Sequence, residues 1–271
     1  MSSPESGEAK ACADTKTQEF TSAPQPTEAA SNFSATASIA HAILARMKPF
    51  LSEQYIEVEA RLCDLGAHPP PLTANSVSAP HLLNGSCRGI QVGVSAEDFH
   101  RMRDFLEAEE KLSLQHTKTE DVITRDGRYT YAIAEDGAET FVGCIKKKRL
   151  CNVEVRVPGS RYDIRLSVST EEPRKKQDAP AVKPQGFVRQ KSRWTATEGT
   201  YEYALTRVGG PADEKTTFEV EIEGVHADAQ KGVTVAWLEE LMSRLLKMAR
   251  LEGNTGLPRN AVPLNQRKQR R

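Results

Sequence analysis

Two short runs near opposite ends of the chain alternate carboxylates with apolar side chains. The first run, Y-I-E-V-E-A-R-L, covers residues 55–62, and the second, F-E-V-E-I-E, covers residues 218–223. Successive side chains of a β-strand point to opposite faces of a sheet, so each run gathers its apolar side chains on one face and its charged side chains on the other. The two runs therefore predict strands that each carry a face rich in carboxylates.

Those carboxylate faces have two interpretations. One is the solvated outer face of an antiparallel sheet, which is the usual role of a single alternating strand. Neighbouring like charges repel, however, so solvated faces usually mix acidic, basic and neutral side chains. The other interpretation is a bound cation that compensates five carboxylates, namely Glu57, Glu59, Glu219, Glu221 and Glu223. Ligand sets made only of oxygen favour Mg²⁺ or Mn²⁺, and the six histidines lack the paired spacing of a zinc site.

Other predicted strands carry rows of basic side chains. The run F-V-R-Q-K-S-R-W, residues 187–194, places Arg189, Lys191 and Arg193 on one face. Evenly spaced cations form a row of charged donors that suits several phosphate oxygens at once. Further cations lie in residues 161–171, in K-K-K-R at 146–149, and at Arg128. For K-K-K-R alone, a partly solvated edge or loop is the simpler interpretation.

The acidic and basic rows can be satisfied together if one sheet closes with its charged faces inward. Metal would then lie on the carboxylates and polyphosphate on the cations. The apolar faces would point outward, where helices and loops must cover them. The pattern therefore predicts a hydrophilic tunnel, whose polarity is the reverse of an ordinary barrel.

The rest of the chain fits a mainly β protein with three peripheral helices. Helices are predicted from Thr36 to Pro49, from the capping box at Ser95, and over residues 234–250, with Gly253 as the last helix stop. About ten short strands indicate an antiparallel β-barrel or a strongly curved sheet. The predicted strands are 54–62, 88–94, 119–124, 128–134, 139–149, 151–157, 161–171, 187–194, 201–208 and 216–223.

Composition divides the chain into three parts. Residues 1–33 are rich in small and polar side chains and are expected to be disordered, residues 34–252 form the tunnel domain, and residues 253–271 are a basic tail. The 37 basic and 37 acidic side chains cancel, which excludes a surface that is positive everywhere. A polyanion must therefore be bound locally.

Cysteine usage and hydropathy bear on the compartment. Five cysteines without a C-x-x-C pair fit neither a disulfide framework nor a zinc ribbon, which indicates a reducing compartment. No segment approaches the roughly 18 apolar residues of a membrane span. We therefore expect a nuclear protein, with the cytosol as the alternative and no membrane partner. The tail N-Q-R-K-Q-R-R is a candidate nuclear import signal, although short basic tails are commonly just solvated ends.

Four of these motifs also carry a resemblance to a known family. In this order, I-E-V-E-A-R-L, Y-D-I-R-L-S-V-S-T-E-E-P, R-Q-K-S-R and F-E-V-E-I-E resemble the metal-dependent RNA 5′-triphosphatases of fungal and protozoan mRNA capping, which are triphosphate tunnel metalloenzymes. The resemblance spans roughly residues 54–224. It implies a closed antiparallel eight-stranded β-barrel tunnel with peripheral helices. It also implies hydrolysis of the γ-phosphate from a 5′-triphosphate end of RNA.

Matching positions in the motifs imply a role for each site residue. The metal ligands would be Glu57, Glu59 and Glu223, with Glu219 as a supporting acid. The catalytic carboxylates would be Glu171, which orients the attacking water, and Glu221, which binds that water or a metal-bound water. The phosphate-binding cations would be Arg128, Lys191 and Arg193, with Lys148 and Arg165 as weaker matches.

One strand departs from the family pattern. The family usually reads Arg-x-Asp-x-Thr where this chain reads E-Y-A-L-T at 202–206, so Glu202 and Ala204 replace the Arg and the Asp. Arg207 faces the other way by parity. Either the register slips by one residue, or another cation such as Arg165 takes the vacant position.

Three functions remain open on this basis. The first is an mRNA-capping RNA 5′-triphosphatase that uses Mg²⁺ or Mn²⁺ and meets the 5′-triphosphate end of RNA, with the RNA guanylyltransferase as a candidate partner. The second is a tripolyphosphatase or nucleoside triphosphatase on the same scaffold. The third is a catalytically silent protein that binds RNA or polyphosphate, which the altered Glu202 and Ala204 motivate.

Overall fold

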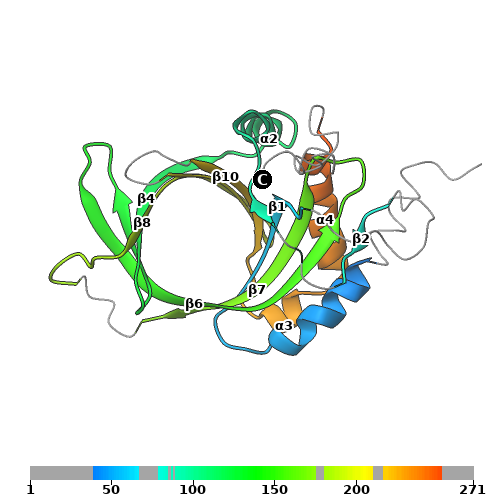
Figure 1. The fold of residues 1–271 in the computed structure, drawn as a ribbon, viewed down its shortest axis with the longest axis horizontal. Helices are drawn as coiled ribbons and strands as arrows, with labels where there is room; N and C mark the ends of the chain where they lie inside the picture. The colour runs from blue at the N-terminus through cyan, green and yellow to red at the C-terminus, as the bar shows by residue number, and fades with distance from the viewer. Residues whose placement is uncertain are drawn as a thin grey trace, which may run out of the picture.

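Eight antiparallel strands close into a barrel, whose interior is called the lumen, in the computed structural model (Figure 1), which describes residues 39–66, 79–84, 87, 89–174, 180–209 and 216–251. The strands follow the order β10-β9-β8-β4-β5-β6-β7-β1, and pairing of β1 with β10 closes the ring. Two short strands, β2 and β3, add to β6 and β1. The bounds are β1 Ile56–Asp64, β2 His81–Leu82, β3 Gln91–Val92, β4 Gln115–Ile123, β5 Arg128–Ile133, β6 Glu139–Arg156, β7 Asp163–Pro173, β8 Phe187–Glu198, β9 Tyr201–Gly209 and β10 Thr217–Gly224.

The predicted closed barrel is thus confirmed, with three differences in its strands. The predicted strand 88–94 is reduced to β3, β2 was not predicted, and β6 joins two predicted strands. The runs 139–149 and 151–157, predicted as separate strands, form one strand of 18 residues. A bulge between Arg149 and Cys151 breaks the register with β7. The extra residue at this point changes which side chains face inward, so inward positions are odd over residues 143–149 and even after the bulge. A second register shift, against β5, leaves Val142 as an extra residue nearer the start of β6.

Helices α2 and α4 begin where the sequence predicts, whereas the predicted start of the first helix at Thr36 lies outside the described residues. Residues 39–47 form a helix that continues as the short 3-10 helix η1, Lys48–Phe50. Ser95 caps α2, Ala96–Ala108, by accepting a hydrogen bond from the Asp98 backbone N–H, and Thr234 caps α4, Val235–Ala249, in the same way. One short helix, α3 at Ala229–Gly232, was not predicted. No helix in the described ranges is long and apolar enough to span a membrane. The predicted N-terminal segment 1–33, the tail 253–271 and the stop at Gly253 lie outside the described residues.

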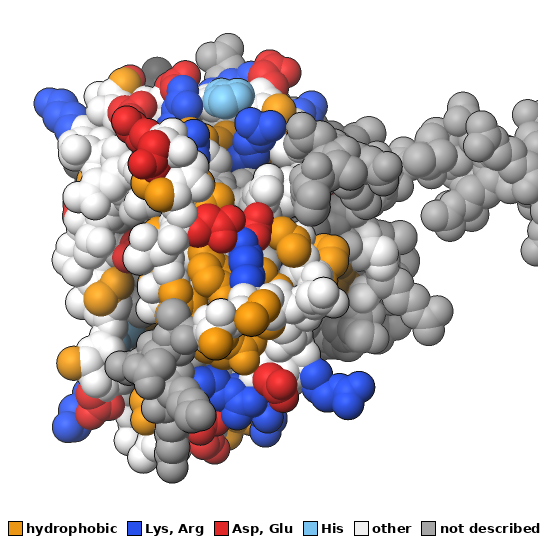
Figure 2. All heavy atoms as spheres, turned by 90° about the vertical axis from the view of Figure 1, so that its left-hand side faces the viewer, with side chains coloured by type: hydrophobic (Ala, Val, Ile, Leu, Met, Phe, Trp, Pro, Cys, Tyr) orange, Lys and Arg blue, Asp and Glu red, His pale blue; other side chains and the backbone are white. Residues whose placement is uncertain are grey.

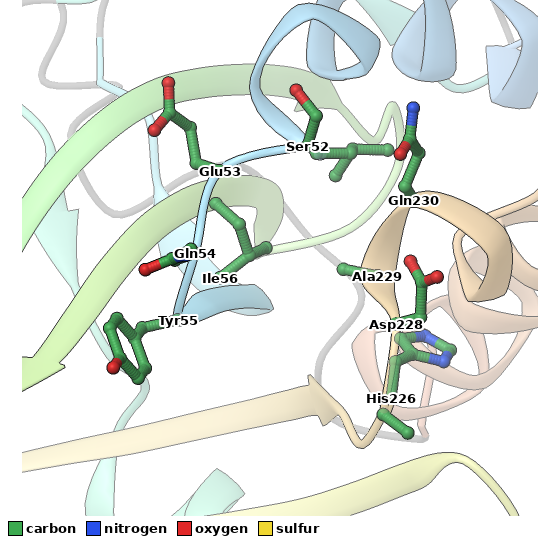
Figure 3. Close-up of a pocket in the computed structure, with 11 residues that line it drawn as sticks. Ser52, Glu53, Gln54, Tyr55, Ile56, His226, Asp228, Ala229 and Gln230 are labelled. Atoms are coloured by element: carbon green, nitrogen blue, oxygen red, sulfur yellow. The ribbon is translucent and has the colours of Figure 1, made fainter.

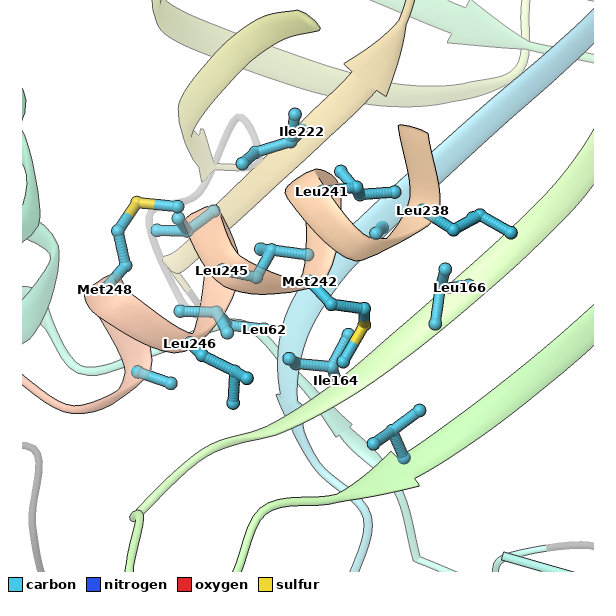
Figure 4. Close-up of a cluster of buried hydrophobic side chains, with 14 of the residues drawn as sticks. Leu62, Ile164, Leu166, Ile222, Leu238, Leu241, Met242, Leu245, Leu246 and Met248 are labelled. Atoms are coloured by element: carbon cyan, nitrogen blue, oxygen red, sulfur yellow. The ribbon is translucent and has the colours of Figure 1, made fainter. Parts of the chain in front are cut away.

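The hydrophobic core lies between the barrel wall and the helices rather than inside the barrel. Figure 4 shows α4 with its leucines and methionines packed against the outer faces of β1, β7 and β10. Leu62, Leu166 and Leu241 are fully buried there. The prediction that the apolar strand faces point outward under the helices is therefore confirmed.

The opposite wall of the barrel, formed by β4, β5 and β8, has a different cover. Among the described elements no helix lies over it (Figure 1), and Figure 2 shows hydrophobic side chains gathered on this face around charged ones. Lys183, from the segment before β8, pairs with Glu120 at 2.6 Å and lies over the Tyr131 ring. A stretch of chain in place of a helix therefore covers part of this wall.

Candidate active site

The carboxylates of β1 and β10 meet on the inner wall of the barrel. Pairing of the two strands sets Glu59 opposite Glu223 and Arg61 opposite Glu221. The side chain of Glu59 is 3 % exposed and that of Glu221 10 % exposed. Arg61 contacts both carboxylates, at 2.5 Å from Glu59 and 2.9 Å from Glu221. The acidic rows that the sequence predicts on two distant runs are therefore neighbours in the lumen.

The ammonium of Lys147 lies among the carboxylates. Lys147 Nζ donates a short hydrogen bond to Glu57, and it lies 3.5 Å from Glu59 and 3.1 Å from Glu171. Arg149, two positions further along β6, contacts Glu59 at 3.0 Å. With the side chains so placed, the described residues contain no group of three or more His, Cys, Asp or Glu side chains arranged to hold a metal ion. Cations of the chain itself therefore pair with the carboxylates of the acidic wall.

The pKa values of the carboxylates reflect this crowding. Burial, together with the negative charges of Glu171 and Glu59, raises the pKa of Glu57 to about 7, although Lys147 opposes the shift. Burial also raises the pKa of Glu221 and of Glu223, against Arg61 and Arg193 respectively. Burial acts in the same direction on Glu59, but Arg61, Lys147 and Arg149 outweigh it and lower its pKa. Negative charge at Glu57 and on β10 is thus incompletely compensated.

The basic row of β8 faces the same lumen. Arg193 contacts Glu223 at 2.5 Å, Lys191 contacts Asp121 at 2.5 Å and Arg189 contacts Glu219 at 3.1 Å. Burial lowers the pKa of Lys191, and the charge of Asp121 only partly offsets this effect. The inward placement predicted for Lys191 and Arg193 is confirmed, and each cation is held by a carboxylate.

Asp121 is a lumen residue that the sequence analysis missed. It is buried on β4 and accepts a hydrogen bond of 2.8 Å from Thr130 Oγ1, in addition to its contact with Lys191. Arg128 lies 4.0 Å from Asp121 and 3.1 Å from Glu171, so it links β4 to β7. The sequence K-T-E-D-V-I has two adjacent acidic residues, so alternation alone does not show which one faces the lumen. In the structure Glu120 faces outward toward Gln190, and Asp121 faces inward.

The inward lysine of K-K-K-R is Lys147, so the inward placement expected of Lys148 is wrong. Lys148 pairs with Thr170 on β7, whose neighbour on β1 is the outward residue Ile56, and Lys148 is exposed. Lys147 instead lies opposite Glu171. Four consecutive basic residues carry no alternation, so only the pairing of β6 with β7 reveals which one faces the lumen.

The altered strand β9 keeps its register. Glu202 lies opposite Glu223 and Ala204 lies opposite Glu221, while Arg207 is exposed on the outer face. Arg193 lies 3.6 Å from Glu202 and thus faces two carboxylates. Of the two explanations that the sequence left open, the register slip is therefore wrong.

Arg165 does not fill the position that the altered strand leaves vacant. It is inward but pairs with Glu154 at 3.1 Å, and Glu221 is instead contacted by Arg61 at 2.9 Å. Arg61 was quoted within the first acidic run but given no role by sequence. Its contact with two strands becomes visible only when β1 and β10 pair.

A pocket of about 440 Å³ opens where β1 and β10 separate (Figure 3). Residues 51–56 and 226–230 line it, including Glu53 and Asp228 but no Lys or Arg. A wall that carries carboxylates and lacks cations is unsuited to phosphate. This pocket is therefore not a candidate phosphate site.

Comparison with known proteins gives the context of this lumen. The family model described as "mRNA capping enzyme, beta chain" matches residues 41–247. The mRNA-capping enzyme subunit beta of Candida albicans is 34% identical over 123 residues, which cover 41% of this chain and 23% of that protein. This chain thus spans less than a quarter of the length of that relative.

Solved structures share the fold. The S. pombe Pct1 RNA triphosphatase superimposes with a TM-score of 0.63 at 20% identity, covering 79% of this chain and 92% of that one. The same protein in complex with the Spt5 CTD gives the same TM-score and covers 93% of its chain. These likenesses confirm the tunnel fold. Since the family model spans most of the chain, including every strand that carries a lumen charge, the chain belongs to the family of the mRNA-capping enzyme beta chain.

Proposed function

We propose that the protein is an RNA 5′-triphosphatase that removes the γ-phosphate from 5′-triphosphate ends of RNA. The observation that carries this proposal is the division of one closed lumen into an acidic wall on β1 and β10 and a basic row on β8. An acidic wall suits a divalent cation, and a basic row suits a polyphosphate. Membership in the family of the mRNA-capping enzyme beta chain supports a reaction at the 5′ end of RNA.

Glu57, Glu59 and Glu223 would hold the metal, which we propose to be Mg²⁺ or Mn²⁺. The donor set fits, because all its ligand atoms are carboxylate oxygens and because Glu57, with its raised pKa, lacks full charge compensation. When bound, the metal supplies a Lewis acid that polarises a phosphate oxygen. Glu219, which pairs with Arg189, would support the basic row rather than bind the metal.

The remaining lumen side chains would bind the phosphates and position water. Lys191, Arg193 and Arg128 would neutralise charge on the non-bridging oxygens, since charge stabilisation dominates phosphoryl transfer. Glu171 would orient the attacking water and Glu221 would bind it on the acidic wall. Arg165 pairs with Glu154 and would act at greater range.

The deciding experiment follows labelled γ-phosphate release from triphosphate-ended RNA, from free nucleotides and from tripolyphosphate, each with Mg²⁺ or Mn²⁺. Release that is fastest with RNA supports the proposal. Equal or faster release from tripolyphosphate or nucleotides identifies the broader phosphohydrolase on the same scaffold. Binding of RNA without release under any metal identifies the catalytically silent alternative.

We also propose that the diphosphate RNA end passes to an RNA guanylyltransferase and that the protein acts in the nucleus. The basic run at 265–271 supports the nuclear proposal. Imaging of a tagged full-length protein with and without this run tests it. Co-purification with the guanylyltransferase of the same cell tests the partner.

A further inference from the structure

One ammonium group links the two carboxylates of β1 to Glu171 on β7. Among the described residues, Lys147 is the one cation that contacts both Glu57 and Glu59, and it also contacts Glu171. Three arginines, Arg61, Arg149 and Arg193, contact Glu59 or Glu223 but not Glu57. The ammonium of Lys147 therefore occupies the position between Glu57 and Glu59.

The chemistry of an ammonium group allows it to occupy a cation position and to leave it when another cation binds. A lysine head group is a compact point charge with three donors on a flexible four-carbon stem, so it can fill a cation position and also leave it. An arginine has a planar fork that pairs in a fixed geometry and is less easily moved. The neighbours of Lys147 are carboxylates that would otherwise repel one another in a partly buried wall.

We propose that Lys147 is a resident cation that a divalent metal must displace from Glu57 and Glu59. Once displaced, its ammonium stays beside Glu171 and Arg128 and turns toward the phosphates that enter from the basic row. No bond forms or breaks in this exchange, and the lumen gains the charge of the metal without losing that of the lysine. The inference rests on the proposed function, because it takes these carboxylates as the metal ligands.

Such an exchange makes Lys147 a determinant of metal affinity. A ligand shifts an equilibrium only by its differential affinity for the two states, and here the metal-free state is stabilised by Lys147. The occupied position thus reduces the apparent affinity for the metal. It also ties phosphate binding to metal loading, since the ammonium is released for phosphate only when the metal arrives.

The test is calorimetric titration of the full-length protein with Mn²⁺ alone, without substrate. Lys147→Met removes the charge but keeps an unbranched side chain of similar length. The matched control is Lys148→Met on the exposed outer face of the same strand, which removes the same charge nearby without touching a carboxylate. We expect Lys147→Met to bind Mn²⁺ about 10- to 100-fold more tightly than the wild type, as expected when an occupant of a binding position is removed. We expect Lys148→Met to bind like the wild type.

Different outcomes separate the two proposals. Unchanged or weaker Mn²⁺ binding by Lys147→Met, or equal tightening by Lys148→Met, overturns the role of Lys147. An absence of Mn²⁺ binding by the wild type and by Lys147→Met overturns the metal site itself. Lys147→Arg keeps the charge and is expected to bind Mn²⁺ no more tightly than the wild type. It therefore serves as the measurement if Lys147→Met does not fold, and tighter binding by Lys147→Arg contradicts the inference.

Discussion

The two faces of β1 are both buried, but they are buried for different reasons. On the outer face Val58, Ala60 and Leu62 pack under helices, and on the inner face Glu59 and Arg61 lie among opposite charges. Burial of apolar area stabilises the fold in proportion to area and largely regardless of partner identity. A buried ion pair adds little net stability, yet removing one partner leaves an uncompensated charge. The outer face therefore holds the barrel together, whereas the inner face fixes its chemistry.

The largest expected effect comes from removing the cover of the outer face. Truncation before Thr234 deletes α4 and exposes the apolar faces of β1, β7 and β10 that it buries. We expect an insoluble protein, because an exposed apolar patch of that size drives aggregation. Solubility after expression is the measurement. Deletion of residues 1–33 is the control and should leave the melting temperature nearly unchanged. A soluble, active protein without α4 would contradict the structural role of the outer face.

On the inner face, Glu59→Ala should abolish hydrolysis while the protein remains folded. An oxygen-ligated metal loses affinity with each missing carboxylate. Glu223→Ala should behave alike, and Glu219→Ala should be milder because its contact is with Arg189. Phosphate release and circular dichroism are measured together. Near-normal release by a folded Glu59→Ala variant counts against the metal assignment.

Lys191→Ala and Arg193→Ala should give graded losses rather than inactivation. Loss of one buried donor to a developing charge costs about 2–4 kcal/mol, which corresponds to a decrease in turnover of roughly 30- to 1,000-fold. Arg193→Lys should rescue Arg193→Ala only in part, because a point charge does not reproduce a planar fork. Ser192→Ala, on the outer face between them, is the control. If Lys191→Ala, Arg193→Ala and Arg193→Lys all turn over as fast as the control and the wild type, the basic row does not act on the phosphates.

The smallest effect concerns stability as a function of pH in metal-free buffer. The pKa of Glu57 is about 7 in the folded protein and 4.5 as the ordinary value, so the folded state binds more protons between these limits. Stability should therefore fall as pH rises through this window, by at most about 1.4 kcal/mol per pH unit from this group. Urea unfolding at several pH values measures the slope. Glu57→Gln should flatten it, and an unchanged slope in that variant would assign it to other groups.

The comparison of faces also explains how much the sequence could predict. Strict alternation of charged and apolar residues in β1 and β10, with the evenly spaced cations of β8, was enough to place most of the proposed lumen residues and to predict where the helices pack. Where alternation fails, so does prediction. Lys147 stands in a run of four basic residues and Asp121 beside another acid, and only their partners across the sheet identify the inward side chain. Such pairings join residues far apart in the chain, as in Arg61 with Glu221.

The bulge at Leu150 decides which side chains of β6 face the lumen along β7. Before it Lys147 and Arg149 point into the lumen, and after it Asn152 and Glu154 do so while Val153 stays in the apolar layer. Deleting Leu150 would shift the alternation of inward and outward side chains by one residue. Every later residue of β6 would then face the opposite side of the sheet. Val153 would lie among the charged side chains of the lumen, and Glu154 would lie in the hydrophobic core. One position without a β7 partner thus keeps the two environments in phase along the part of β6 that pairs with β7.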